Sequence, residues 1–148
     1  MSSAPAYPIS GRSMQSITKK TILGIRLAVL ALVGYWLLIF VLTHLPAESL
    51  KPPKVNDKLA HFLAYGGLGM LMCYVTTSDR VIKRFGSIAA IGMTYAALDE
   101  YTQSFVEGRY SDPYDFLADA AGLCTAILVY ATLRGVFSLW KKSRTALT

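Results

Sequence analysis

The 148-residue sequence predicts an all-α fold, a four-helix transmembrane bundle with both termini in the cytoplasm. Three observations lead to this fold class. Hydrophobic residues make up 53% of the chain and charged residues 16%, and the mean hydropathy of +0.41 is high for a soluble domain. The apolar residues are grouped in four runs separated by polar segments. The basic residues gather at the ends of these runs, as is typical of the loops of membrane proteins.

The N-terminal residues 1–20 are predicted to form a disordered cytoplasmic tail, because residues 1–16 are rich in Ser and Pro and show no apolar period. The first apolar run extends from Ile22 to Leu45, and Arg26 lies close enough to its end to reach the interface. The run is longer than the ~7–15 apolar residues of a signal peptide, and no small-residue cleavage site follows it. We therefore expect a retained helix.

Three further apolar runs complete the predicted bundle. The second extends from Leu59 to Thr76, and at about 1.5 Å per residue it measures roughly 27 Å, just enough to cross a bilayer. The third extends from Phe85 to Phe105 and the fourth from Pro113 to about Phe137. We predict a transmembrane domain over residues 21–138 and a basic cytoplasmic tail over residues 139–148.

The basic residues also predict the orientation. Four lie in the N-terminal part, three in the second loop and four near the C-terminus, which places eleven of the fifteen on one side of the membrane. Eight of the nine acidic residues, all but Asp79, fall on the other side. We therefore expect cytoplasmic termini and an acidic outer face.

The net charge of +6 does not indicate a nucleic-acid partner, because the basic residues lie at segment ends rather than in one patch. The expected partners are membrane lipids, and the sequence does not determine an oligomeric state. Cys73 and Cys124 fall inside apolar runs without a partner at metal-ligand spacing, so we interpret them as packing residues. We predict no cofactor and no metal.

Asp57, His61 and Tyr65 form the first part of a candidate site. Their spacing of four residues places all three on one face of the second helix. A carboxylate one turn from a histidine can orient the imidazole and raise its basicity. Asp57 could equally be a helix N-cap, whereas an intramembrane histidine seldom faces lipid, so His61 is interpreted as functional.

Asp99, Glu100 and Gln103 form the second part, in the third run. Asp99 and Gln103 share a face, whereas Glu100 points about 100° away from Asp99. A structural alternative is a polar contact between helices, typically worth only ~0.6–2 kcal/mol. Ser or Asn would provide such a contact without the desolvation cost of an acid, so we favour a functional interpretation.

Four more polar residues follow. Arg109 could pair with neighbouring acids or offer a bidentate fork to a phosphate or carboxylate ligand. Asp112 and Asp115 flank Pro113 in a pattern typical of a helix start, which by itself could account for both acids, and a role in the site stays open for them. Asp119 lies inside an apolar run, where no cap is needed, so a functional role is favoured.

Two polar blocks carry a resemblance to a known family. The first is Asp57, Lys58, His61, Phe62 and Tyr65, and the second is Asp99, Glu100, Gln103, Ser104, Phe105, Gly108, Arg109, Asp112, Asp115 and Gly122. Together they resemble the VanZ-like family of bacterial membrane proteins. The match covers roughly residues 27–130, and two residues depart from the family pattern: Glu107 replaces a proline, and Asp119 replaces an asparagine and adds a charge to the candidate site. The resemblance implies four transmembrane helices in the bacterial cytoplasmic membrane. The family is named after a member associated with glycopeptide resistance.

Two functions of different classes fit this site at the outer face. The first is an enzyme that acts on a lipid-linked or cell-envelope substrate, with a glycan or an anionic headgroup, by acid/base chemistry. The alternative is a non-enzymatic envelope protein that binds a glycan, lipid or glycopeptide antibiotic and modifies resistance or access. A metal site formed by His61 and the acids ranks third, because no compact ligand motif is present. The predicted catalytic residues are His61, Asp99, Glu100 and Asp119. The predicted substrate-binding residues are Asp57, Lys58, Tyr65, Gln103, Arg109, Asp112 and Asp115.

Overall fold

A computed structural model describes residues 21–22, 25–46, 56–78 and 80–145. This part of the chain forms four α-helices, which confirms the predicted class and number of helices, and one antiparallel pair of two-residue strands. The elements are β1 (Thr21–Ile22), β2 (Ile25–Arg26), α1 (Leu27–Thr43), α2 (Asp57–Val75), α3 (Val81–Gln103) and α4 (Pro113–Thr145). The predicted N-terminal tail lies outside the described residues.

The helix boundaries differ most from the predicted runs at the start of α1 and at the end of α4. α1 begins at Leu27 rather than Ile22, because the chain first pairs Thr21 and Ile22 with Arg26 and Ile25 in the short hairpin. α4 continues past Phe137 to Thr145 and is about 50 Å long at about 1.5 Å per residue. Among the helices of the described residues, α4 alone is long and apolar enough to span a membrane by length and composition, and α1, with 17 residues, is apolar but shorter.

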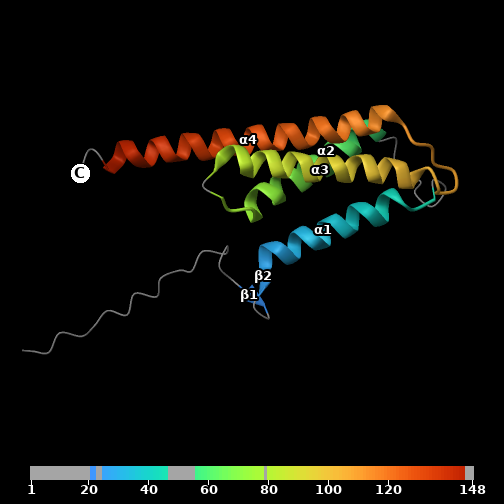
Figure 1. The fold of residues 1–148 in the computed structure, drawn as a ribbon, viewed down its shortest axis with the longest axis horizontal. Coiled ribbons are helices and arrows are strands. Elements are labelled where there is room, and N and C mark those ends of the chain that lie inside the picture. The colour runs from blue at the N-terminus through green and yellow to red at the C-terminus, as the bar shows by residue number, and fades with distance from the viewer. Residues whose placement is uncertain (1–20, 23–24, 47–55, 79, 146–148) are drawn as a thin grey trace, which may run out of the picture.

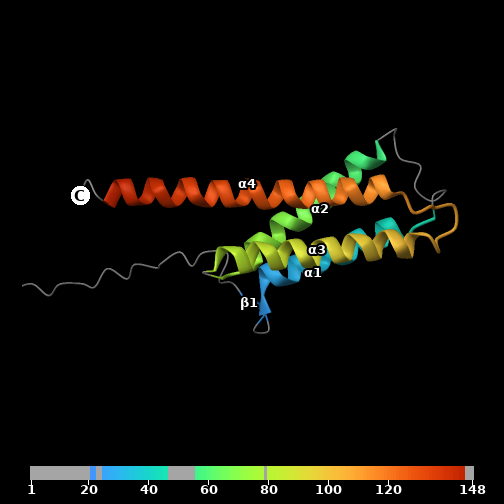
Figure 2. The ribbon, with the colours of Figure 1, turned by 45° about the horizontal axis from the view of Figure 1, so that its top comes forward.

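The helices pack side by side with their connections at two opposite ends (Figures 1 and 2). α1 and α3 end, and α2 and α4 begin, at the same end of the bundle. The C-terminal end of α4 extends beyond the other helices at the opposite end (Figure 1). The polar segments that the sequence analysis identified therefore meet at one end of the bundle.

Glycine lets α2 and α4 approach backbone to backbone. A Cβ on Gly66 would lie 3.7 Å from the carbonyl oxygen of Gly122, and a Cβ on Gly122 would collide with the carbonyl oxygen of Phe62. Small residues permit such close helix crossings in membrane proteins. The contact lies about one turn from His61 on α2 and from Asp119 on α4, so it fixes how closely these two side chains meet.

The predicted second loop is wrong in one detail, the position of Arg84. The sequence analysis counted it among the basic residues of the second loop, but it lies within α3 and its side chain is buried. Its guanidinium donates to the carbonyl oxygen of Cys73 and to the hydroxyl of Tyr130, and it lies over the rings of Phe85 and Tyr130. Arg84 therefore connects α2, α3 and α4 at the end of the bundle away from the acidic residues.

Replacing Gly122 with alanine should destabilise the bundle by roughly 1–3 kcal/mol, because the new methyl group meets backbone atoms of α2 that cannot rotate away. Thermal unfolding of the purified protein in detergent, followed by circular dichroism, measures the effect. Gly135→Ala is the matched control on the same helix, since its Cβ would enter open space. Equal midpoints for the two variants would contradict the close crossing.

Candidate functional site

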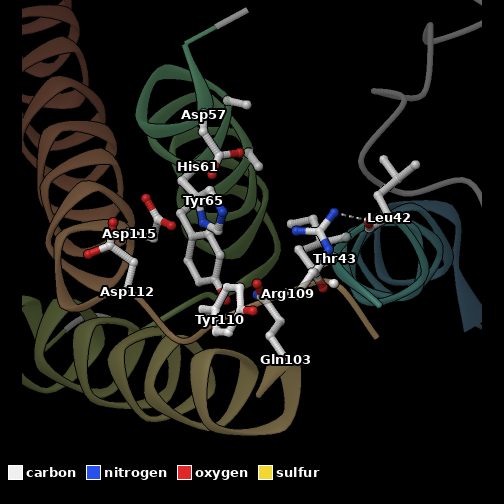
Figure 3. A pocket seen from close by; sticks show the side chains of 14 residues that line it. Leu42, Thr43, Asp57, His61, Tyr65, Gln103, Arg109, Tyr110, Asp112 and Asp115 are labelled. Carbon is white, nitrogen blue, oxygen red and sulfur yellow. Dashed lines mark hydrogen bonds between the residues drawn. The ribbon is translucent and has the colours of Figure 1, made fainter. Parts of the chain in front are cut away.

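A pocket of about 640 Å³ lies at the acidic end of the bundle, between α1, α2 and the connection from α3 to α4 (Figure 3). One part of its lining is apolar, with Ile39, Leu42, Ala60 and Ala64. The rest is polar and includes seven of the eleven predicted site residues. These seven are Asp57, His61, Tyr65, Gln103, Arg109, Asp112 and Asp115.

Each of the other four predicted residues hydrogen-bonds to a residue of this lining. Asp119 contacts His61, Asp99 contacts Gln103, Glu100 accepts from the backbone N–H of Asp112, and Lys58 contacts Asp112 and Asp115. The fold thus brings all eleven residues together in two layers. The inner layer is the seven residues that border the pocket, and the outer layer is the four residues that hydrogen-bond to them. The catalytic and binding roles assigned to these eleven residues remain predictions.

His61 and Asp119 form a buried pair between α2 and α4. The Nδ1 atom of His61 lies 3.0 Å from Oδ1 of Asp119, and Asp119 is 0% exposed. When Asp119 is ionised, its carboxylate can only accept, so Nδ1 carries the proton and, in the neutral imidazole, Nε2 carries the lone pair. Nε2 has no hydrogen-bond partner in the part of the chain that the structure describes, and the ring borders the pocket.

Asp57 lies one turn before His61 and is exposed at the start of α2. The sequence analysis considered Asp57 as a helix cap, but the cap is Asn56, whose side chain accepts the N–H of Lys58 at 3.1 Å. The carboxylate of Asp57 is therefore not used in capping α2. It faces the pocket from the same side of α2 as His61 and Tyr65 (Figure 3).

Asp99 is buried and held by two neutral donors. Its Oδ1 accepts from Thr43 at 3.0 Å, and its Oδ2 accepts from the side-chain amide of Gln103 at 2.9 Å. His44 lies 3.8 Å from the same carboxylate and hydrogen-bonds to Thr102. Sequence reasoning missed Thr43 and His44. The signal that could have identified them is a pair of adjacent polar residues near the end of the first apolar run, on the same predicted side of the membrane as the acidic residues.

Arg109 takes a role that the sequence analysis did not consider. Its Nε donates to the carbonyl oxygen of Leu45 at 3.0 Å and its Nη2 to that of Leu42 at 3.3 Å (Figure 3). A cation near the last carbonyl groups of a helix satisfies acceptors that lack a helical partner. Gly108, with φ of 75°, turns the chain immediately before it. Arg109 therefore ties the α3–α4 connection to the end of α1.

Asp112 caps α4 as the sequence predicted. Its Oδ1 accepts from the N–H of Tyr114 at 2.9 Å, and the helix begins at Pro113. Lys58 lies 2.7 Å from Asp112 Oδ2 and 2.7 Å from Asp115 Oδ1. The hydrogen bond from Lys58, and then the one from the N–H of Tyr114, hold the pKa of Asp112 below its ordinary value of 3.8.

Several buried polar atoms lack a hydrogen-bond partner among the described residues. They include the hydroxyl of Tyr65, Oε1 of Glu100 and Oδ2 of Asp119. Two groups of side chains could also bring three metal-ligand atoms within 4.8 Å of one another. These groups are Asp57, His61 and Asp115, and His61, Glu100 and Asp119. His61 belongs to both, so it is the central residue of the site.

Comparison with known proteins gives one match. The family model described as VanZ/LLP1 matches residues 13–134, well over half of the chain. The comparisons with curated proteins and with solved structures gave no match. The matched range contains both polar blocks and every residue of the pocket.

The bridge from Lys58 should stabilise the fold only while its partners are ionised. Because the pKa of Asp112 is lowered in the fold, this stabilisation is present above pH 3.8 and is lost as the pH falls through the lowered pKa. Thermal midpoints of wild type and Lys58→Met should therefore differ at pH 7 and converge in acid. Lys83→Met, an exposed lysine on α3, is the control and should show no such convergence. A difference independent of pH would contradict the bridge.

Proposed function

The chain belongs to the VanZ-like family, and we propose that it is a multi-pass protein of the bacterial cytoplasmic membrane that acts on a lipid-linked or cell-envelope substrate. In this proposal the substrate binds in the polar pocket, which faces the periplasm or the cell exterior. His61 performs acid/base chemistry there.

The proposed topology has four membrane-spanning helices and both termini in the cytoplasm. Large apolar side chains are exposed on every helix of the described residues, for example Leu37, Leu63, Leu98 and Leu128, which are 60%, 60%, 56% and 67% exposed. Exposed apolar surface of this extent is typical of contact with lipid or with another protein. The distribution of Lys and Arg along the sequence supports an outward-facing pocket.

The observation that carries the proposed chemistry is the pair of His61 and Asp119. A buried carboxylate on Nδ1 orients the ring and stabilises the imidazolium that forms when Nε2 takes a proton. Because the His61 ring borders the pocket and Nε2 has no hydrogen-bond partner among the described residues, Nε2 is the ring nitrogen available to a bound substrate. Asp99, Glu100 and Asp119 do not border the pocket, so in this mechanism they act as positioning residues.

The lining of the pocket indicates the class of substrate. Its volume of about 640 Å³ lies in the range of small-molecule sites, ~300–1,000 Å³. The apolar wall from Ile39 and Leu42 suits a lipid chain, and the carboxylates of Asp57 and Asp115 can accept hydrogen bonds from sugar hydroxyls. A glycan carried on a lipid therefore fits better than a free anion.

Reporter fusions test the topology. A fusion after Tyr110 should report an external location, and fusions after Lys83 and Lys142 should report a cytoplasmic one, since eleven of the fifteen basic residues lie on the predicted inner side. A reversed result at any of the three positions would overturn the proposed topology.

The proposed chemistry predicts that His61→Asn and Asp119→Asn lower activity by about 10²–10⁴-fold at normal protein abundance, because general acid/base catalysis contributes that much. The measurement compares pools of lipid-linked envelope precursors, and glycopeptide susceptibility, in a bacterial strain expressing each variant. Glu107→Gln is the control, since Glu107 is exposed and outside the pocket.

Three outcomes separate the hypotheses. The enzyme hypothesis is supported if the precursor pools change on expression of wild type or Glu107→Gln but not on expression of His61→Asn or Asp119→Asn. Altered susceptibility without any change in the pools favours the non-enzymatic binding protein. Variants that fail to accumulate but keep full activity per molecule would show that the pair of His61 and Asp119 only stabilises the fold.

A further inference from the structure

We propose that the pocket binds a divalent transition-metal ion, such as Zn²⁺ or Mn²⁺, through the carboxylates of Asp57 and Asp115 and the imidazole of His61. The sequence analysis predicted no metal, because these residues form no compact motif along the chain. The fold brings them together from two helices, α2 and α4.

The spacing of the donor atoms suits such an ion. One donor atom from each of Asp57, His61 and Asp115 lies within 4.8 Å of the other two. Bonds of about 2.0–2.2 Å to one zinc ion place ligand atoms roughly 3–4.4 Å apart. The upper limit of 4.8 Å therefore exceeds the separations around one ion by only a few tenths of an ångström, which small side-chain movements can remove. Asp57 and His61 are one helical turn apart, so α2 presents both to the same point.

Asp119 prepares His61 for metal binding. Metal-binding histidines commonly donate their second ring N–H to a carboxylate, which fixes the ring and makes the binding nitrogen more basic. The hydrogen bond from Nδ1 of His61 to Asp119 is of this kind and leaves Nε2 for the ion. Lys58 contacts Oδ1 of Asp115, so the other oxygen of that carboxylate remains available.

Unpartnered buried atoms are independent evidence for a bound ligand. The hydroxyl of Tyr65, which is 0% exposed and belongs to the pocket lining, has no hydrogen-bond partner among the described residues. Oδ2 of Asp119 and Oε1 of Glu100, beside His61, have none there either. Buried carboxylates are costly unless a charge compensates them. A cation bound by His61 supplies that compensation.

The charges of the pocket favour a cation over an anion. Three carboxylates, those of Asp57, Asp112 and Asp115, border the pocket together with one guanidinium, that of Arg109, which donates to carbonyl groups of α1. Lys58, outside the lining, pairs with Asp112 and Asp115, and the carboxylates still outnumber these two cations. Imidazole with two carboxylates suits Zn²⁺ or Mn²⁺ better than Mg²⁺ or Ca²⁺, which prefer oxygen ligands. A bound ion would also let this acidic pocket receive an anionic headgroup. The inference rests on the proposed function only for that headgroup. With the ion bound, Nε2 of His61 is a metal ligand, so it no longer serves as the proton acceptor of the proposed acid/base chemistry.

Metal binding to the purified full-length chain in detergent tests the inference. After treatment with a chelator and buffer exchange, Mn²⁺ is titrated and its free fraction is followed by electron paramagnetic resonance. We expect one Mn²⁺ per chain, displaced by equimolar Zn²⁺ but not by equimolar Mg²⁺. Asp57→Asn and His61→Gln should abolish binding at this site, and Asp119→Asn should weaken it by about 10–100-fold.

Glu107→Gln, which changes an exposed acid outside the pocket, should bind as the wild type does. The thermal midpoint should rise with Zn²⁺ for wild type and Glu107→Gln but not for Asp57→Asn, which separates lost binding from lost folding. Failure of the wild type to bind, or undiminished binding by Asp57→Asn, would overturn the metal site. Either result would leave Nε2 of His61 without a metal and free for the proposed acid/base chemistry, which is then judged on its own activity measurement.

Discussion

The close crossing of α2 and α4 at Gly66 and Gly122 is the constraint on which the site depends. Without side chains at these positions the two backbones come into contact, and about one turn away the fixed separation places Nδ1 of His61 3.0 Å from Oδ1 of Asp119. Packed interiors transmit small displacements rather than absorbing them. A wider crossing would therefore separate a buried acid from its partner, at a cost to stability and to the geometry of the pocket.

The polar end of the bundle is organised as a supporting layer and a pocket lining. Asp99, Glu100 and Asp119 are buried, and each hydrogen-bonds to a residue or backbone group that borders the pocket. A buried polar network specifies one arrangement when its members are satisfied and is costly when they are not. Here Glu100 and Asp119 each keep one oxygen without a partner among the described residues. The network thus holds His61, and a cation in the proposed metal site would compensate the two unpartnered oxygens.

The family resemblance is confirmed, and the structure changes the interpretation of individual residues within it. Arg109, expected to hold a ligand or to pair with acids, donates to carbonyl groups at the end of α1. Asp119, a departure from the family pattern, is the fully buried partner of His61. Residues that match a family pattern can therefore serve the fold, and a residue that departs from the pattern can lie at the centre of the site.

The sequence by itself determined the all-α class, the number of helices, the family and the identity of the polar residues, because apolar run length and the cost of burying charge are local properties of the chain. It also determined the cap of α4, since Asp112 followed by Pro113 is a local signal. Only the tertiary structure decided that Asn56 caps α2, that Thr43 supports Asp99 and that Arg109 binds α1. These outcomes depend on which groups meet across helices or at a helix end, and such pairings follow from packing rather than from spacing along the chain.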